Sequence, residues 1–172
     1  MACSNLTAGF TLDCNDSNGG IDKIFIANGP VESITETAGT ITAITVGGSA
    51  LTPSDFFEFE VPRQTSSATE TINVSQENGT VFYDQALTMI FNKMEAVKRD
   101  QILLMAQATN MVVVFKDNNE KFFSVGVKRG AFMTSGSSLS GTAYGDRNGY
   151  ELVISGMEED PMFEVTSTIV EA

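Results

Sequence analysis

Hydrophobic and polar residues alternate in short runs along most of this chain, as they do in half-buried β-strands. The clearest run covers residues 56–61, where Phe57, Phe59 and Val61 fall on one face and two glutamates fall on the other. Glycine, proline and asparagine separate such runs, as turn residues do. The same criteria predict further strands at residues 21–27, 31–37, 40–46, 70–75, 81–91, 111–115, 121–128, 150–155 and 163–169.

The hydrophobic period changes between Lys93 and Ala108, where apolar residues recur at helical spacing and β-branched residues are few. This pattern predicts one amphipathic helix near residues 94–108, and Asn92 is placed to cap its start. The predicted apolar side consists of Met94, Val97, Leu104, Met105 and Ala108.

Short strands and a single helix predict a mostly β fold, a β-sandwich or barrel with one flanking helix. Residues 1–20 are small, polar and glycine-rich, and we expect an irregular N-terminal arm. Residues 62–69 hold no core-forming side chain and predict an exposed loop, while residues 134–141 predict a mobile loop or hairpin. Since no linker or repeat interrupts the chain, we expect residues 1–172 to form a single domain.

The composition bears on possible partners. Apolar residues make up 42% and charged residues 19% of the chain, which suits either a self-associating protein or an ordinary domain. The 22 acidic and 10 basic residues give a net charge of −12. Because nucleic-acid binding relies on basic patches, this balance argues against it and favours a surface along which DNA slides without sticking.

The inventory of reactive side chains argues against an enzyme. The chain has no histidine, no phosphate-binding glycine loop and no nucleophile elbow, although a site made of carboxylates alone stays open. We interpret the acidic run at residues 158–160 as a solvated turn. Asp13, Asn15 and Ser17 imitate part of a calcium loop that lacks its glycine and its final glutamate. We therefore expect no catalytic residue, no metal and no cofactor.

The N-terminus has no secretion signal, and no apolar run is long enough for a membrane helix, so we expect synthesis in a cytoplasm and no membrane partner. Cys3 and Cys14 are the only cysteines. They can form a bridge, but free thiols suit a reducing compartment better.

Several segments carry a family resemblance. They include Leu-Thr-Ala-Gly-Phe-Thr-Leu-Asp-Cys at residues 6–14 and Ser-Gly-Thr-Ala-Tyr-Gly-Asp-Arg-Asn-Gly-Tyr at residues 140–150. In order along the chain they resemble tail tube and related virion structural proteins of long-tailed bacteriophages of Bacteroidetes-type hosts. The other matching segments are residues 19–28, 70–80, 92–99 and 114–123.

The resemblance implies a tail-tube β-sandwich that closes into hexameric rings, which stack into a conduit for the genome. The implied partners are further copies of this chain and other tail proteins, in the tail of a virion, and DNA would pass through without specific binding. One sheet face should line an acidic lumen, with Glu58 and Glu60 as candidates. A loop should reach the next ring, from residues 47–55 or 62–69. In the second loop the candidates are Arg63, Gln64, Thr65 and Ser66.

Two other functions stay open. One is a different virion component, such as a head decoration or tail-completion protein, which would not form stacked rings. The other is a carbohydrate-binding or adhesin module, which would need an exposed aromatic platform. Phe56, Phe57 and Phe59 are the candidates for such a platform, although phenylalanine in a strand is more often part of the core.

Overall fold

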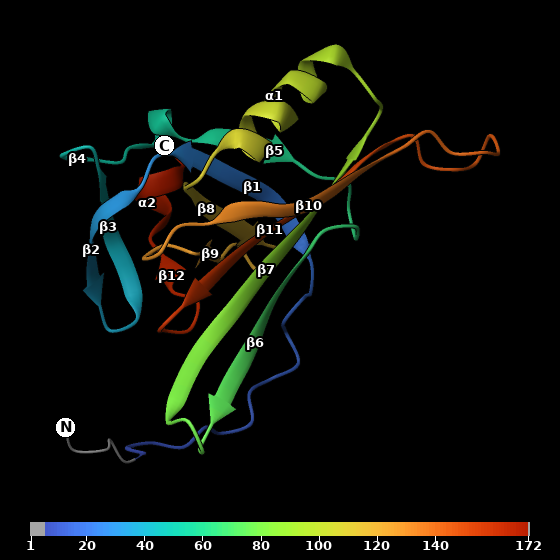
Figure 1. Ribbon diagram of the computed structural model, residues 1–172. Helices are drawn as coiled ribbons and strands as arrows, with labels where there is room; N and C mark the ends of the chain where they lie inside the picture. The colour runs from blue at the N-terminus through green and yellow to red at the C-terminus, as the bar shows by residue number, and fades with distance from the viewer. Residues whose placement is uncertain (1–5, 172) are drawn as a thin grey trace.

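The computed structural model describes residues 6–171, which form two β-sheets with one main helix (Figure 1). Strands account for 49% and helices for 11% of the chain, and the sheets do not close into a barrel. The mostly β prediction is therefore confirmed, and of its two forms the sandwich is the one observed. No helix within the described residues has both the length and the apolar character needed to cross a membrane.

Sheet A is built around β8 (Met111–Asp117), whose first five residues form an unbroken buried run. Such a run needs apolar neighbours on both faces of the sheet. Val113 faces the space between the two sheets, whereas Val112 and Val114 face the other side of sheet A. The strand order is β2 (Val31–Thr37), β3 (Thr40–Val46), β12 (Glu164–Val165), β9 (Phe122–Val125), β8, β1 (Ile21–Asn28) and β5 (Phe57–Glu60), and β4 (Ser49–Ala50) pairs with β3.

Sheet B has four antiparallel strands, in the order β10 (Phe132–Leu139), β11 (Gly149–Glu158), β7 (Thr80–Asn92) and β6 (Ser67–Ser75). The central strands β7 and β11 supply the alternating residues Leu87, Met89, Leu152 and Ile154 to the core between the sheets. Strand β11 passes close to the turn after β9, where a Cβ atom on Gly156 would lie 2.6 Å from the Cα of Gly126. Glycine at position 156 allows β11 to pass so near to this turn.

A second core lies on the other face of sheet A and includes Phe25, Ile44 and Phe122. The short helix α2 (Ser167–Val170) closes it with Ile169 and Val170, and the 3₁₀ helix η1 (Pro53–Asp55) lies next to α2. The prediction of a strand at residues 163–169 is therefore wrong beyond β12. Val165 and Ile169 lie four residues apart, a spacing that one helical turn satisfies as well as a strand does.

The region 134–141 was predicted as a mobile loop or hairpin, and most of it is strand β10. Its serines and Gly136 are poor strand formers, but their backbone groups pair with β11 from Phe132 to Leu139. The loop itself begins later, at residues 140–148.

The run at residues 56–61 forms β5 on the edge of sheet A, but its burial differs from the expected alternation. Phe56 is buried in the second core, Phe59 packs partly against the first core, and Phe57 is 58% exposed. The prediction that Phe57 is buried is wrong, because β5 lies at the edge of its sheet, where Phe57 is left largely uncovered. For Phe56 the core interpretation is confirmed.

The predicted helix exists as α1 (Ala96–Gln107), but its cap and its buried side differ from the prediction. Glu95 occupies the N-cap position, and Asn92 is the last residue of β7. Met105 is the buried residue of α1, and Ile102 packs beside it on the core between the sheets. Val97 is 75% exposed, Leu104 is 59% exposed, and Met94, which precedes the helix, is exposed as well. The apolar side of α1 is thus wider than the part of the helix that packs against the core.

Candidate assembly interface

One face of sheet B is left uncovered. The sheet B side chains that enter the core between the sheets come from alternating positions, such as Leu87, Met89 and Leu152. Their neighbours Thr88 and Glu151 point the other way, and neither belongs to a buried cluster. This outward face is mixed, because Phe82, Ile90, Phe132 and Met157 lie on it together with small polar and acidic residues. Its members include Thr69, Thr71, Asp84, Thr88, Ser135, Ser137, Glu151, Val153 and Ser155.

Both outer strands of sheet B have a free edge within the described residues, since β6 pairs only with β7 and β10 only with β11. Every residue of β10 except Met133 is exposed. Unpaired backbone N–H and C=O groups along such an edge are ready to pair with another strand. Sheet B therefore offers two open strands on opposite sides of one uncovered face.

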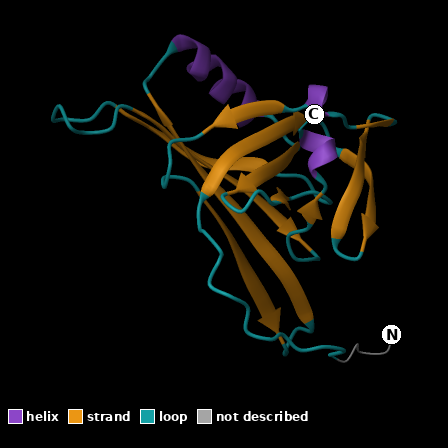
Figure 2. Ribbon diagram, turned by 180° about the vertical axis from the view of Figure 1, so that it is seen from behind, coloured by secondary structure: helices purple, strands orange, loops and turns teal. Residues whose placement is uncertain are grey.

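Two segments project from the body of the molecule (Figure 1, Figure 2). The hairpin of β6 and β7 carries the exposed apolar residues Ile72, Val74 and Val81 near its tip. The loop at residues 140–148 is shaped by Asp146, whose carboxylate accepts the backbone N–H groups of nearby loop residues. The N–H bonds from Ala143 and Thr142 lower the pKa of Asp146. Neither projection was among the loops predicted to reach a neighbouring ring.

A groove lies between α1 and the free edge of β5. It contains two adjoining cavities of about 230 Å³ and 120 Å³. The exposed residues Val97 and Leu104 line its helix side, and Phe57 lines its strand side. An apolar groove beside an unpaired strand edge is suited to receive an extended segment.

The predicted lumen residues Glu58 and Glu60 lie on β5, and thus on sheet A. The Glu58 carboxylate lies 2.7 Å from Lys23 Nζ, and this hydrogen-bonded pair raises the pKa of Lys23. Glu60 is exposed. The structure therefore places these two glutamates on a different sheet from the acids of the outward face, Asp84 and Glu151. Their position in a lumen stays a prediction.

The predicted inter-ring loop at residues 62–69 is a short turn that continues into β6. Thr65 Oγ1 donates a hydrogen bond to the Pro62 carbonyl at 2.6 Å, and Ser66 Oγ accepts the N–H of Ile90 at 3.3 Å. Ser66 is buried, so the prediction of full exposure is wrong there, because the turn is held against β7. Arg63 and Gln64 are exposed, and their role between rings stays a prediction.

The alternative loop at residues 47–55 is also held in place. The N–H of Gly48 donates to the Glu32 carboxylate, and the Thr52 hydroxyl donates to Asp55. These side-chain and backbone hydrogen bonds from Thr52 lower the pKa of Asp55. Neither predicted loop projects like the hairpin of β6 and β7.

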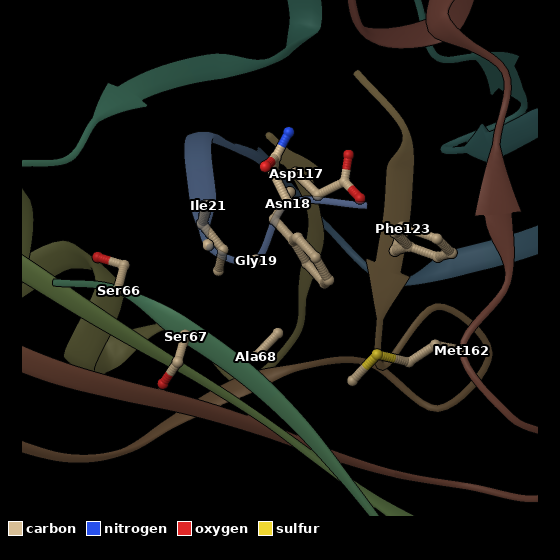
Figure 3. Close-up of a pocket in the computed structure, with 11 residues that line it drawn as sticks. Asn18, Gly19, Ile21, Ser66, Ser67, Ala68, Asp117, Phe123 and Met162 are labelled. Carbon is tan, nitrogen blue, oxygen red and sulfur yellow. The ribbon is translucent and has the colours of Figure 1, made fainter. Parts of the chain in front are cut away.

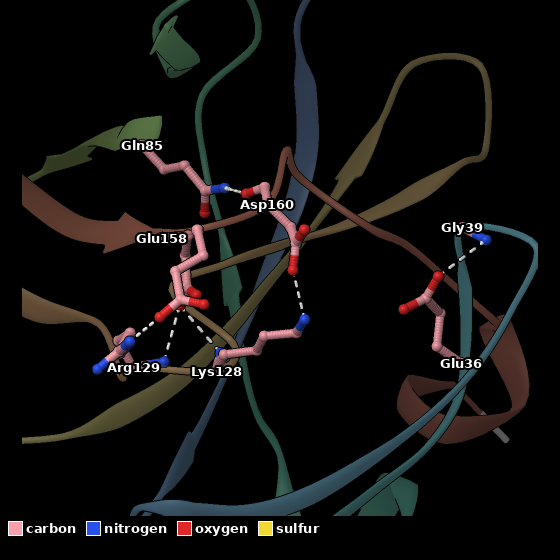
Figure 4. Close-up of polar contacts among 8 residues, drawn as sticks. Glu36, Gly39, Gln85, Lys128, Arg129, Glu158 and Asp160 are labelled. Atoms are coloured by element: carbon pink, nitrogen blue, oxygen red, sulfur yellow. Dashed lines mark hydrogen bonds and ion pairs between the residues drawn. The ribbon is translucent and has the colours of Figure 1, made fainter. Parts of the chain in front are cut away.

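The acidic run at residues 158–160 was interpreted as solvated, and this is wrong for Glu158, which is 4% exposed (Figure 4). Glu158 Oε1 accepts the backbone N–H groups of Lys128 and Arg129 at 2.9 and 2.8 Å, while Oε2 has no hydrogen-bond partner among the described residues. Burial raises the pKa of Glu158, against the N–H groups of Arg129 and Lys128, which lower it.

The acids next to Glu158 belong to the same polar cluster. Glu159 pairs with Arg129, and Asp160 pairs with Lys128. The buried Gln85 donates to Glu70 at 3.0 Å and accepts the N–H of Gly126 at 2.9 Å. Because β6, β7, β11 and the turn after β9 all contribute, we interpret the cluster as a structural joint between the sheets.

A cavity of about 390 Å³ lies between the sheets near the base of the N-terminal arm (Figure 3). Its walls are largely apolar, with Ile21, Phe123 and Met162 among them. Asp117 is the charged residue among the described lining residues, and its carboxylate already accepts N–H groups of Asn119 and Lys121. We interpret this cavity as a packing gap rather than a ligand site.

Metal and cysteine chemistry find little support in residues 6–171. Within this range no three potential ligands from histidine, cysteine, aspartate and glutamate come together to hold a metal ion. The imitation of a calcium loop lies on the exposed arm, as does the free thiol of Cys14. Cys3 lies outside the described residues, and so does any bridge that it makes.

Comparison with known proteins gave no relative. Neither a scan against models of protein families, nor a search of curated proteins, nor a search of solved structures found a match to this chain.

Proposed function

We propose that this protein is a non-enzymatic structural subunit of a bacteriophage tail tube, which assembles as stacked rings of six copies around a channel for DNA. The observation that carries the proposal is sheet B, a four-stranded sheet with one uncovered face and, within the described residues, two free edges. The resemblance along the chain supplies the phage context. Other tail proteins would be its partners, and the tail of the virion its location.

A ring removes both free edges at once. If β10 of each copy pairs with β6 of the next, six copies form a closed barrel of about 24 strands. Barrels of 16 to 18 strands already leave an aqueous channel, so this one would be wide enough for water and solute. The face that lies outward in the single subunit would then line the channel.

The side chains of that face suit a passage for DNA. Asp84 and Glu151 are acidic, hydroxyl residues such as Thr71 and Ser137 are frequent, and the remaining positions are mostly apolar. A wall without lysine or arginine gives the phosphates little to bind. The net charge of −12 adds a general repulsion between subunit and DNA.

The edge pairing can be tested by placing charges on both outer strands. The variant T69D/S135D would bring acids of one sign together across each new strand pair, where like charges destabilise. Both positions are exposed and lie opposite the apolar residues Ala86 and Val153, so the single subunit should fold normally, as judged by circular dichroism. We expect light scattering to show that this variant remains monomeric at concentrations where the unchanged protein assembles.

The matched control carries opposite signs on the two edges, T69K/S135D. It should assemble at least as well as the unchanged chain, because opposite charges now face each other. Equal assembly of the same-sign and opposite-sign variants would show that these edges do not meet. Particles that form single rings without stacking would favour the decoration or completion role.

A further inference from the structure

The N-terminal arm has a pattern that the folded subunit does not use. Leu6, Ala8, Phe10 and Leu12 alternate with polar or small residues, as the side chains of a half-buried strand do. Nevertheless, every residue from 6 to 20 is exposed, and Leu6, Phe10 and Leu12 contact the solvent over their whole surface. The arm therefore has one apolar face and no surface beneath it.

The groove between α1 and β5 has the complementary features. Among residues 6–171 no strand pairs with the outer edge of β5, and the exposed residues Val97, Leu104 and Phe57 line the space beside it. A strand added along β5 would satisfy the open backbone groups and direct its alternate side chains toward α1. The match is one of apolar surface and backbone groups, because the groove's charges are already balanced: Lys98 pairs with Glu95, and Glu58 and Glu60 also line the groove.

The arm is directed away from the groove of its own subunit. Its base is fixed at the turn after β8, where Asn18 and Asn119 exchange two hydrogen bonds of 2.8 Å and Asn118 donates to the Gly19 carbonyl. From there the arm runs along β6 and past the tip of the β6–β7 hairpin, while α1 lies at the opposite end of the molecule (Figure 1, Figure 2). The described residues 6–17, free of the anchor, reach roughly 40 Å when extended.

We propose that residues 6–13 of one copy add as a strand to the free edge of β5 in a second copy, with Leu6, Phe10 and Leu12 packed in the groove against α1. This contact rests on the proposed function, because the second copy is taken to be a subunit of the adjacent ring. Arm and groove lie at opposite ends of the subunit, so the contact is head-to-tail, and repetition of it stacks copies in one direction.

The surface area that this contact would bury is small for a stable dimer and suits one of several contacts within a larger assembly. An aromatic side chain buries about 150–250 Å². A strand of eight residues with three large apolar side chains then buries on the order of 1,000 Å² in total, near the lower limit for specific interfaces. Six such contacts between two rings would act together.

Photo-crosslinking between distinguishable copies tests the proposal. A full chain with benzoylphenylalanine in place of Phe10, at natural isotope abundance, is mixed with the ¹⁵N-labelled unchanged chain and irradiated. Mass spectrometry then identifies the crosslinked peptides. We expect the light arm to crosslink to heavy peptides from residues 96–108 or 56–61. Adding L12D to the light chain should lower this yield at least ~10-fold, and T11D, on the polar face, should leave it unchanged.

Three results would overturn the proposal: no crosslink, crosslinks only within light chains, or heavy crosslinks concentrated on the hairpin around residues 72–82. The proposed function is judged separately, because rings form through sheet B. Rings or tubes in electron micrographs without arm crosslinks to α1 or β5 would remove this contact alone. Crosslinks to α1 without rings would retain the contact and remove the tube.

Discussion

Glu158 shows that the residues next to it in the sequence do not predict the environment of a single side chain. Three consecutive acids indicate a solvated turn, and Glu159 and Asp160 do reach partly exposed partners. Glu158, however, occupies an inward position of β11, where alternation places it beside the backbone N–H groups of Lys128 and Arg129. That contact joins residues about 30 positions apart in the sequence, which no local pattern reveals.

The raised pKa of Glu158 predicts a pH-dependent stability. The folded state disfavours the ionised carboxylate of Glu158. The resulting loss of stability is absent below the ordinary pKa of 4.5 and grows as the pH rises to the raised pKa of the folded state. In E158Q the side chain carries no charge at any pH. We therefore expect the free energy of unfolding of E158Q, relative to the unchanged chain, to increase from pH 4.5 upward and then to level off.

Urea denaturation at closely spaced pH values measures this difference. In E158Q an amide N–H₂ group can occupy the place of Oε2, which has no partner among the described residues. This lowers the free energy of unfolding by the same amount at every pH, so it shifts the curve of stability against pH without changing its shape. If the free energies of unfolding of the two proteins changed in parallel with pH, ionisation of Glu158 would not destabilise the folded state.

At the scale of the element, alternation located most strands, though not β10, and was a weaker guide to what covers them. The strands at residues 31–37 and 40–46 have the predicted bounds, because Thr- and Ile-rich runs between glycines leave few alternatives. For α1 the period predicted a helix, but the covered side depends on where β5 and β7 lie. Since that position is a tertiary property, Ile102 and Met105 are packed while Val97 and Leu104 are not.

The two sides of α1 should respond differently to the same substitution. We expect V97S/L104S to keep the stability of the single subunit within about 0.5 kcal/mol, because both side chains are largely exposed. The same variant should assemble less well, since it removes apolar surface from the groove. The measurements are urea denaturation at low concentration and light scattering at high concentration.

The matched control is I102S/M105S, which changes the packed side of the same helix. It should lose about 2–5 kcal/mol of stability at the buried Met105 through the cavity created there, and less at the partly buried Ile102. If V97S/L104S instead unfolded as readily as the control, α1 would be packed on the side that this structure leaves open.

At the scale of the whole molecule, composition allows surfaces that other copies cover, but it does not say which surfaces these are. Glu58 and Glu60 were chosen as lumen candidates because they alternate cleanly in sequence, and the structure places them on sheet A beside α1. The outward face of sheet B draws on four strands between Ser67 and Glu158. No sequence window contains that face, and strand order could not be predicted from the chain.

Charge reversal distinguishes the two possible channel walls. Asp84 lies on the outward face of sheet B and Glu60 on β5. We expect assembled D84K to retain short duplex DNA at low salt and to protect it from nuclease, because six new lysines would lie in the channel. Assembled E60K should leave any bound DNA open to nuclease. Protection by E60K and not by D84K would place β5 on the channel and restore the sequence-based assignment.

Electron microscopy of the purified protein over a wide range of concentrations tests the central claim most directly. The proposed ring closure through the free edges of β6 and β10 predicts hollow rings of six copies, and stacked tubes at high concentration. Particles that remain single subunits at every concentration, in the absence of other tail proteins, would contradict it.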